Sequence, residues 1–220
     1  MFILFIAFVE EMKTLSLEEW ISPVYLANSF PERAKKRFIS NKPFSHLVFQ
    51  QFLRSEKVVA LEKALAKEDF HLKDADLFTF FQTNDLVGTK NKVLQDFRAF
   101  LSSSAFTSFI SKITNIRLVP QKIDLAGSLY TSTHHLLPHD DHLEKRKVAF
   151  MLYLTTLKKK DGGALGLYAS ENGNATKIVK RIQPEKNTFV FFTVSKKSFH
   201  EVEEVLSSKK RVALSGWYYD

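Results

Sequence analysis

Apolar residues in the first half of the chain recur at helical spacing. The stretch 15–40 carries them at intervals of three and four, interrupted by Pro23 and Pro31. The stretch 56–68 places apolar residues on one face and lysines on the other. The stretch 91–114 reads as one helix, a serine break and a second helix. This pattern predicts a mainly helical first half.

The second half changes to short, β-rich runs separated by turn signals. Glycine and asparagine mark turns at 161–163 and 172–174, and Pro184 opens another at 184–187. Many short strands after a helical section favour a β-sandwich or barrel braced by helices on one face, which is an α+β fold. The predicted strands are 122–133, 148–157, 164–170, 177–184, 188–195, 198–205 and 211–219.

The composition fits one globular domain with an aromatic core. With 220 residues and 21 phenylalanines, we expect a single domain over 1–220. Its helical support should cover about 1–115 and its β core about 116–220. The absence of cysteine excludes disulfides, thiolate-bound zinc, iron–sulfur clusters and cysteine nucleophiles. A reducing compartment suits such a chain, so we expect the cytoplasm, or the nucleus in a eukaryote.

The chain starts with an apolar run, MFILFIAFV, that is too short to span a bilayer. It also lacks the basic leader and the small-residue cleavage site of a signal peptide. We expect a strand or a packed helix end here, or a true start at Met12, and no membrane partner.

Lysine and arginine exceed the acids and give a net charge of +8. Such a balance favours an anionic partner, such as RNA or a ribonucleoprotein. A basic surface that only keeps the protein in solution explains the same charge equally well. The basic runs lie at 33–37, 145–147, 158–160 and 209–211.

His139 and Asp141 stand two residues apart, just before a strongly apolar run. Residues two apart face one side of a strand, so an imidazole and a carboxylate can converge on one ion. His200, in a later predicted strand, can supply a second imidazole. Two histidines and one carboxylate form the facial triad of non-haem Fe(II) oxygenases. Because the H-x-D pair fixes only two residues, a surface turn in which Asp140 and Asp141 cap strand ends remains an alternative.

Arg211 and Tyr130 add a second part to this pattern. Arg211 opens the last predicted strand, eleven residues after His200, where a guanidinium can hold a ligand carboxylate in a bidentate clamp. Tyr130 lies nine residues before His139 and can donate a hydrogen bond to the same carboxylate. A dicarboxylic keto acid would chelate iron at one end and meet Arg211 at the other. Alone, Arg211 is explained as a surface charge within a lysine run, and Tyr130 as a half-buried strand tyrosine. Their combination with the H-x-D pair and His200 favours an oxygenase.

Six stretches between about residues 40 and 220 carry a family pattern. They are KPFSHLVFQQFL, DFHLKDADLFTFFQTNDL, LLPHDDHLEKRKVAFMLYL, GGALGLYAS, IVKRIQPEKNTFVFFTVSKKSFHEVEEVL and RVALSGWYY. Together they closely resemble the ribosomal prolyl hydroxylases, of the Ofd/Tpa type, in the 2-oxoglutarate oxygenase superfamily.

This resemblance implies a double-stranded β-helix core of the jelly-roll or cupin kind, braced by the N-terminal helices. It implies Fe(II) held by His139, Asp141 and His200, and 2-oxoglutarate held by Tyr130 and Arg211. O2 is the second co-substrate, with ascorbate as an optional reductant. The implied activity is hydroxylation of a prolyl residue in a small-subunit ribosomal protein of the uS12 kind.

Two features depart from the family pattern. Many relatives carry a serine two residues after the arginine, where its hydroxyl helps bind the carboxylate, and this chain has Ala213 there. Eukaryotic members also carry a second, non-catalytic β-helix domain, whereas the printed sequence ends at Asp220. Two alternatives stay open: an oxygenase acting on another protein or a small molecule, and a non-catalytic β-helix module that binds a ribonucleoprotein.

Other polar and aromatic residues near the motif receive other roles. His134, His135 and His142 are expected in loops or on the surface rather than as ligands, because the triad has a fixed ligand count. Asp140 can orient a ligand histidine as a hydrogen-bond acceptor. Trp217 lies six residues after Arg211 on the same strand face; we expect it to pack in the core, and lining of the cofactor pocket is the alternative. The acids expected to contact basic residues beside the target proline are Glu201, Glu203 and Glu204.

Overall fold

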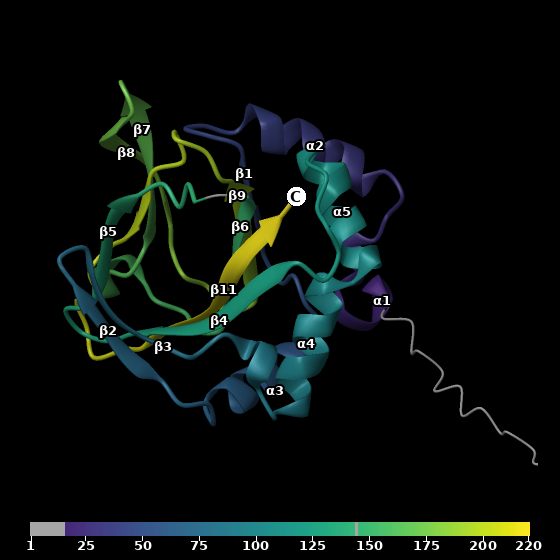
Figure 1. Cartoon of the computed structure of the whole chain (residues 1–220), viewed down its shortest axis with the longest axis horizontal. Helices are drawn as coiled ribbons and strands as arrows, with labels where there is room; N and C mark the ends of the chain where they lie inside the picture. The colour runs from purple at the N-terminus through teal and green to yellow at the C-terminus, as the bar shows by residue number, and fades with distance from the viewer. Residues whose placement is uncertain (1–15, 144) are drawn as a thin grey trace, which may run out of the picture.

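The computed structural model describes residues 16–143 and 145–220, in which α-helices brace a curled sheet (Figure 1). The predicted helices are confirmed, including the serine break: Ser103 ends α4 and caps α5, and its Oγ accepts a hydrogen bond from the N–H of Phe106 at 3.2 Å. The helices are α1 (Leu17–Trp20), α2 (Phe30–Ser40), α3 (Ser55–Leu65), α4 (Lys92–Ser102) and α5 (Ser104–Thr114), with 3-10 turns at Pro23–Tyr25, Leu86–Gly88 and Lys159–Asp161.

All the predicted strands are present, and the structure adds four more. The additions, β1, β2, β3 and β5, are short, and β2 is exposed along its whole length, so no apolar alternation marks it. The first half is therefore less purely helical than predicted. The strands are β1 (His46–Phe49), β2 (His71–Ala75), β3 (Phe78–Gln82), β4 (Ile123–Tyr130), β5 (His135–His139), β6 (Arg146–Tyr153), β7 (Leu165–Glu171), β8 (Asn174–Ile182), β9 (Thr188–Thr193), β10 (His200–Val202) and β11 (Arg211–Tyr219).

The sheet curls until its two end strands approach each other. Neighbouring strands follow the order β1-β9-β6-β11-β4-β3-β5-β10-β7-β8, with β2 paired to β3 outside this path. At the ends, the Nζ of Lys180 on β8 lies 3.0 Å from the Nε2 of His46 on β1. This curled antiparallel sheet is the double-stranded β-helix that the family resemblance implies.

Alternation along the central strands divides the core into two layers. On β9, Phe189 and Phe191 pack against the helices, whereas Val190 and Phe192 point into the curl of the sheet. The helices gather on one side of the sheet, over the strands β6, β9 and β11 (Figure 1). On β11 the inward face carries Arg211 and Ala213, so the same alternation delivers polar groups to the interior.

Among the described residues, no helix is both long and apolar enough to cross a bilayer. The apolar run at the N-terminus and Met12, for which a strand, a helix end or an alternative start is predicted, lie outside the described residues.

Candidate metal centre and its cavity

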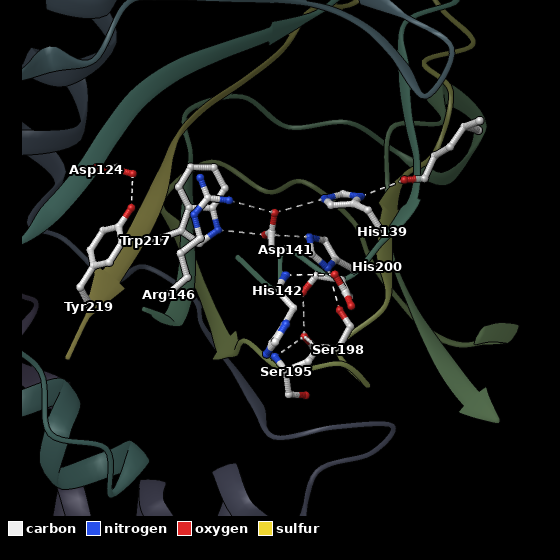
Figure 2. Close-up of polar contacts among 12 residues, drawn as sticks. Asp124, His139, Asp141, His142, Arg146, Ser195, Ser198, His200, Trp217 and Tyr219 are labelled. Carbon is white, nitrogen blue, oxygen red and sulfur yellow. Dashed lines mark hydrogen bonds and ion pairs between the residues drawn. The ribbon is translucent and has the colours of Figure 1, made fainter. Parts of the chain in front are cut away.

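The pairing of β5 with β10 brings His139 and His200 together. The two residues are register partners in this antiparallel pair, and their ring centroids are 4.2 Å apart. Asp141 completes the group, since one ligand atom from each of the three side chains lies within 4.8 Å of the others (Figure 2). The three predicted metal ligands are therefore adjacent in the structure.

Asp141 reaches the histidines by a route that differs from the predicted one. β5 ends at His139, and Asp141 lies in the following loop with a φ of 57°, a left-handed conformation that is uncommon for a non-glycine residue. Its Oδ1 lies 3.6 Å from the Nε2 of His139, and its Oδ2 lies 3.3 Å from the Nε2 of His200. The prediction that His139 and Asp141 share one strand face is wrong, but the loop still turns the carboxylate toward the imidazole.

Both imidazoles are oriented by a backbone carbonyl two residues earlier in the chain. The Nδ1 atoms of His139 and His200 each lie 2.8 Å from a carbonyl oxygen, that of Leu137 and Ser198 respectively. Donation from Nδ1–H leaves the lone pair of Nε2 on the side that faces the carboxylate, as a metal ligand requires. Asp140 does not orient either histidine, because its Oδ1 accepts the backbone N–H of His142 at 3.0 Å.

Charge and burial prepare the triad for a cation. Burial would raise the pKa of Asp141, but the adjacent imidazoles of His200 and His139 and the hydrogen bond from the Trp217 N–H outweigh it and hold that pKa well below its usual range. Burial and the neighbouring His200 lower the pKa of His139 to about 4. The carboxylate is therefore ionised and His139 neutral at neutral pH, the protonation states in which both bind a metal ion.

Arg211 is a buried cation without a carboxylate partner in the described part of the chain. It is 2% exposed, and its Nε donates to the carbonyl of Gly163 at 2.9 Å. One Nη lies 3.4 Å from the hydroxyl of Tyr153. The ion pairs among residues 16–143 and 145–220 do not include Arg211. Since an unpaired buried charge is costly, this site calls for an anionic ligand.

Tyr130 lies directly across the sheet from Arg211. The two are register partners of β4 and β11, and the guanidinium carbon is 4.9 Å from the centre of the Tyr130 ring. Burial raises the pKa of Tyr130, so its phenol stays protonated and can donate a hydrogen bond. Next along β11, Ala213 pairs with Ser128, so a hydroxyl lines the cavity opposite the position where relatives carry serine.

One cavity of about 340 Å³ joins these groups. Its lining includes all five predicted site residues. Apolar side chains, mainly from the two hydrophobic clusters on the inside of the curled sheet, make up most of the rest. This volume is within the range of small-molecule sites in proteins. The five site residues that line it are Tyr130, His139, Asp141, His200 and Arg211.

Trp217 and Arg146 also line the cavity; for Trp217 this is the alternative to the favoured core packing, and for Arg146 no role in the cavity was predicted. Trp217, expected to pack in the core, donates its Nε1–H to the Oδ2 of Asp141 at 3.0 Å (Figure 2). A signal for this was present, because Trp217 is an even number of residues from Arg211 on one strand. No sequence signal marks Arg146, which begins β6 and is the register partner of Tyr219 on β11.

The remaining histidines and the acids after His200 lie outside the cavity lining. His134 is buried rather than in the expected exposed position, with its Nε2 3.3 Å from the Oγ1 of Thr131. Along β10, Glu201 and Glu203 alternate with cavity-lining residues, so they face away from it. The Glu203 carboxylate also pairs with Arg181 at 2.5 Å. The expected contact of these acids with basic residues beside the target proline would lie outside this cavity and stays a prediction.

Comparison with known proteins assigns this site to a family. Residues 125–219 match the model of the 2OG-Fe(II) oxygenase superfamily. Residues 125–219 belong to this superfamily. The matched segment begins in β4, before Tyr130, and ends in β11, after Arg211, so it contains every predicted site residue. Membership and the His-Asp-His group together imply Fe(II) and 2-oxoglutarate.

Two curated members of the superfamily resemble most of this chain. The mouse (Mus musculus) "Prolyl 3-hydroxylase OGFOD1" is 41% identical over 181 residues, which cover 80% of this chain and 33% of the mouse protein. The frog (Xenopus laevis) protein of the same name is 40% identical over 185 residues, which cover 82% of this chain and 36% of the frog protein. The chain thus matches about a third of the length of these relatives.

A solved oxygenase structure supports the fold. The crystal structure of a Pseudomonas putida prolyl-4-hydroxylase superposes with a TM-score of 0.68 at 17% identity, covering 84% of this chain and 98% of that one.

The residues present fit both implied groups. Two imidazole nitrogens and a carboxylate within 4.8 Å of one another are a donor set suited to Fe(II). The buried guanidinium of Arg211, which lacks a described carboxylate partner, fits the distal carboxylate of 2-oxoglutarate.

Proposed function

We propose that this chain is a prolyl hydroxylase domain that uses Fe(II), 2-oxoglutarate and O2. The observation that carries the proposal is the buried guanidinium of Arg211, which has no carboxylate partner within residues 16–143 and 145–220, in the same cavity as the His-Asp-His group. A metal site at one place and a cation at another suit a co-substrate with two acidic ends. The 41% identity to a named prolyl 3-hydroxylase supports a prolyl target.

Each site residue then has a distinct role. His139, Asp141 and His200 hold the metal, and Arg211 with Tyr130 holds the distal carboxylate. Fe(II), when bound, supplies the oxidative chemistry that couples decarboxylation of 2-oxoglutarate to oxygen insertion. Arg211 neutralises the charge of the co-substrate, and the protonated phenol of Tyr130 donates a hydrogen bond. The apolar lining excludes water, so these polar contacts act in a low-dielectric site.

We propose a small-subunit ribosomal protein of the uS12 kind as the target, hydroxylated at ring carbon 3. The family resemblance supports the ribosomal target, and the names of the mouse and frog relatives support ring carbon 3. The net charge of +8 favours proximity to ribosomal RNA. We also propose that residues 1–220 act as one oxygenase domain, with the helical support and β core described above, in the cytoplasm or nucleus.

Mass spectrometry of a prolyl peptide tests this function. The protein is incubated with Fe(II), 2-oxoglutarate, ascorbate, O2 and a peptide from a proline-containing loop of that ribosomal protein. We expect the peptide to gain one oxygen atom on proline, and a matched peptide with alanine in place of that proline to gain none. Turnover of 2-oxoglutarate without any gain on the peptide or on the intact ribosomal protein would reject the target and leave the oxygenase chemistry standing.

A further inference from the structure

The carboxylate of Asp141 contacts more than the two histidines. Its Oδ2 accepts the Nε1–H of Trp217 at 3.0 Å, and its Oδ1 lies 3.9 Å from an Nη of Arg146. Its backbone has a φ of 57°, outside the strand that carries His139. A ligand on a loop has no sheet register to fix its side chain, so its orientation depends on these contacts.

Trp217 and Arg146 support each other on neighbouring strands. The guanidinium carbon of Arg146 lies 3.6 Å from the centre of the Trp217 ring, a close cation–π stack. Arg146 is the register partner of Tyr219, whose hydroxyl donates to Asp124 (Figure 2). Trp217 stands on β11, the strand that also carries Arg211. Both groups are therefore held by sheet strands, while Asp141 is not.

We propose that Trp217 and Arg146 form a clamp that positions the Asp141 carboxylate and thereby sets the affinity of the metal site. This inference rests on the proposed function, since it concerns the same metal. Trp217 occupies one lone pair of Oδ2 and fixes the plane of the carboxylate, and Arg146 holds the indole by stacking on its ring. Removing hydrogen-bond partners of metal ligands typically costs about 10- to 100-fold in metal affinity or activity.

Simple packing is the competing explanation for Trp217. Its ring also contacts the inward-facing apolar cluster that includes Ala149 and Ala213. Trp217→Phe keeps an aromatic ring there but removes the Nε1–H donor, so it separates the two roles. Trp20→Phe is a matched control, because Trp20 packs in the helix-side core and its Nε1 has no hydrogen-bond partner in the described residues.

Calorimetry with Mn(II), a redox-inert substitute for Fe(II), measures the effect on metal-free protein. We expect Trp217→Phe to weaken Mn(II) binding by about tenfold or more, and Trp20→Phe to change it less than twofold. The midpoint of thermal unfolding without metal reports whether each variant folds. In turnover assays, Trp217→Phe should raise the Fe(II) concentration needed for half-maximal rate, while kcat at saturating Fe(II) falls much less.

Fluorescence gives a second readout, in which unsubstituted Trp217 is the reporter and the Trp217→Phe variant is the comparison. The chain has two tryptophans, so Trp20→Phe leaves Trp217 as the sole indole. Co(II) should strongly quench this emission, whereas in Trp217→Phe the emission of Trp20 should change little.

The outcomes below distinguish failure of the proposed clamp from failure of the proposed metal site. If the wild-type chain binds Mn(II) and turns over but Trp217→Phe binds Mn(II) within twofold of it, the clamp is wrong and the proposed function stands. If Trp217→Phe does not fold, Arg146→Met replaces it, and Mn(II) affinity within twofold of wild type again rejects the clamp. A wild-type chain that binds no Mn(II) or Fe(II) rejects both proposals.

Discussion

His139 and His200 lie opposite each other across β5 and β10, with 4.2 Å between their ring centroids. The backbone carbonyls of Leu137 and Ser198 fix both rings so that each Nε2 faces Asp141. Two acceptor nitrogens and a carboxylate therefore converge where a cation would satisfy all three.

A bound metal ion should consequently stabilise the fold. Mn(II) at 100 times its dissociation constant should add about 2.7 kcal/mol to the free energy of unfolding. Asp141→Ala removes the charged ligand and should weaken Mn(II) binding at least tenfold and abolish turnover. The neighbouring Asp140→Ala is the matched control, because among the described residues the side chain of Asp140 accepts a hydrogen bond only from the backbone N–H of His142. Thermal unfolding with and without Mn(II) measures the stabilisation by the metal in the wild type and in both variants. If Mn(II) raises the unfolding midpoint of Asp141→Ala as much as that of the wild type, the triad is wrong.

Arg211→Ala should weaken 2-oxoglutarate binding by about 2–5 kcal/mol, since it leaves the distal carboxylate without its paired charge. The Michaelis constant for 2-oxoglutarate and direct calorimetry on the Mn(II) protein report the loss. The adjacent and exposed Lys210→Ala changes the net charge equally and should leave the constant unaltered. If Arg211→Ala folds and retains the wild-type Michaelis constant, the carboxylate is held elsewhere.

Tyr130→Phe should cost less, about 0.5–1.5 kcal/mol of 2-oxoglutarate affinity, because one ordinary hydrogen bond is lost. The ring itself should remain stacked on Phe80, whose centroid is 4.8 Å away, so stability should change little. The same calorimetric titration checks this value. A loss as large as that of Arg211→Ala would mean that the phenol does more than donate one hydrogen bond.

The contact between His46 on β1 and Lys180 on β8 predicts that the free energy of unfolding depends on pH. Burial lowers the pKa of His46 below its ordinary value of 6.5, and Lys180 adds to this shift. The unfolded chain therefore takes up a proton that the folded chain does not, and stability is lost as the pH falls below about 6.5. The loss from one such group reaches at most about 1.4 kcal/mol per pH unit.

Urea unfolding of metal-free protein at pH 7.5 and 5.5 measures this loss. His46→Gln keeps an acceptor for Lys180 but does not titrate. Between pH 7.5 and 5.5 its free energy of unfolding should fall by about 1 kcal/mol less than that of the wild type. His71→Gln, on the exposed strand β2, should behave as wild type. Equal losses in wild type and His46→Gln would show that His46 does not resist protonation.

The sequence predicts the strands that carry apolar alternation, and the H-x-D pair predicts the chemistry of the triad once it is joined with Arg211, Tyr130 and the family resemblance. It does not predict the conformation of Asp141, because a left-handed loop leaves no periodic signature. β5 escaped prediction since Pro138 and His139 interrupt any apolar pattern. The even spacing of Trp217 and Arg211 offers cavity lining as the alternative to core packing, whereas the place of Arg146 depends on contacts between strands that only the folded chain reveals.

Oxygen balance gives the most direct test of the proposed reaction. 2-Oxoglutarate, O2 and a prolyl residue would give succinate, carbon dioxide and a hydroxyprolyl residue. One oxygen atom of O2 would enter succinate and the other would enter the hydroxyprolyl residue. With ¹⁸O₂, Fe(II) and the ribosomal peptide, we expect one ¹⁸O in succinate and one in the prolyl product, in equal molar amounts and dependent on Asp141. The absence of ¹⁸O from both succinate and peptide, in protein that binds the metal, would contradict an oxygenase.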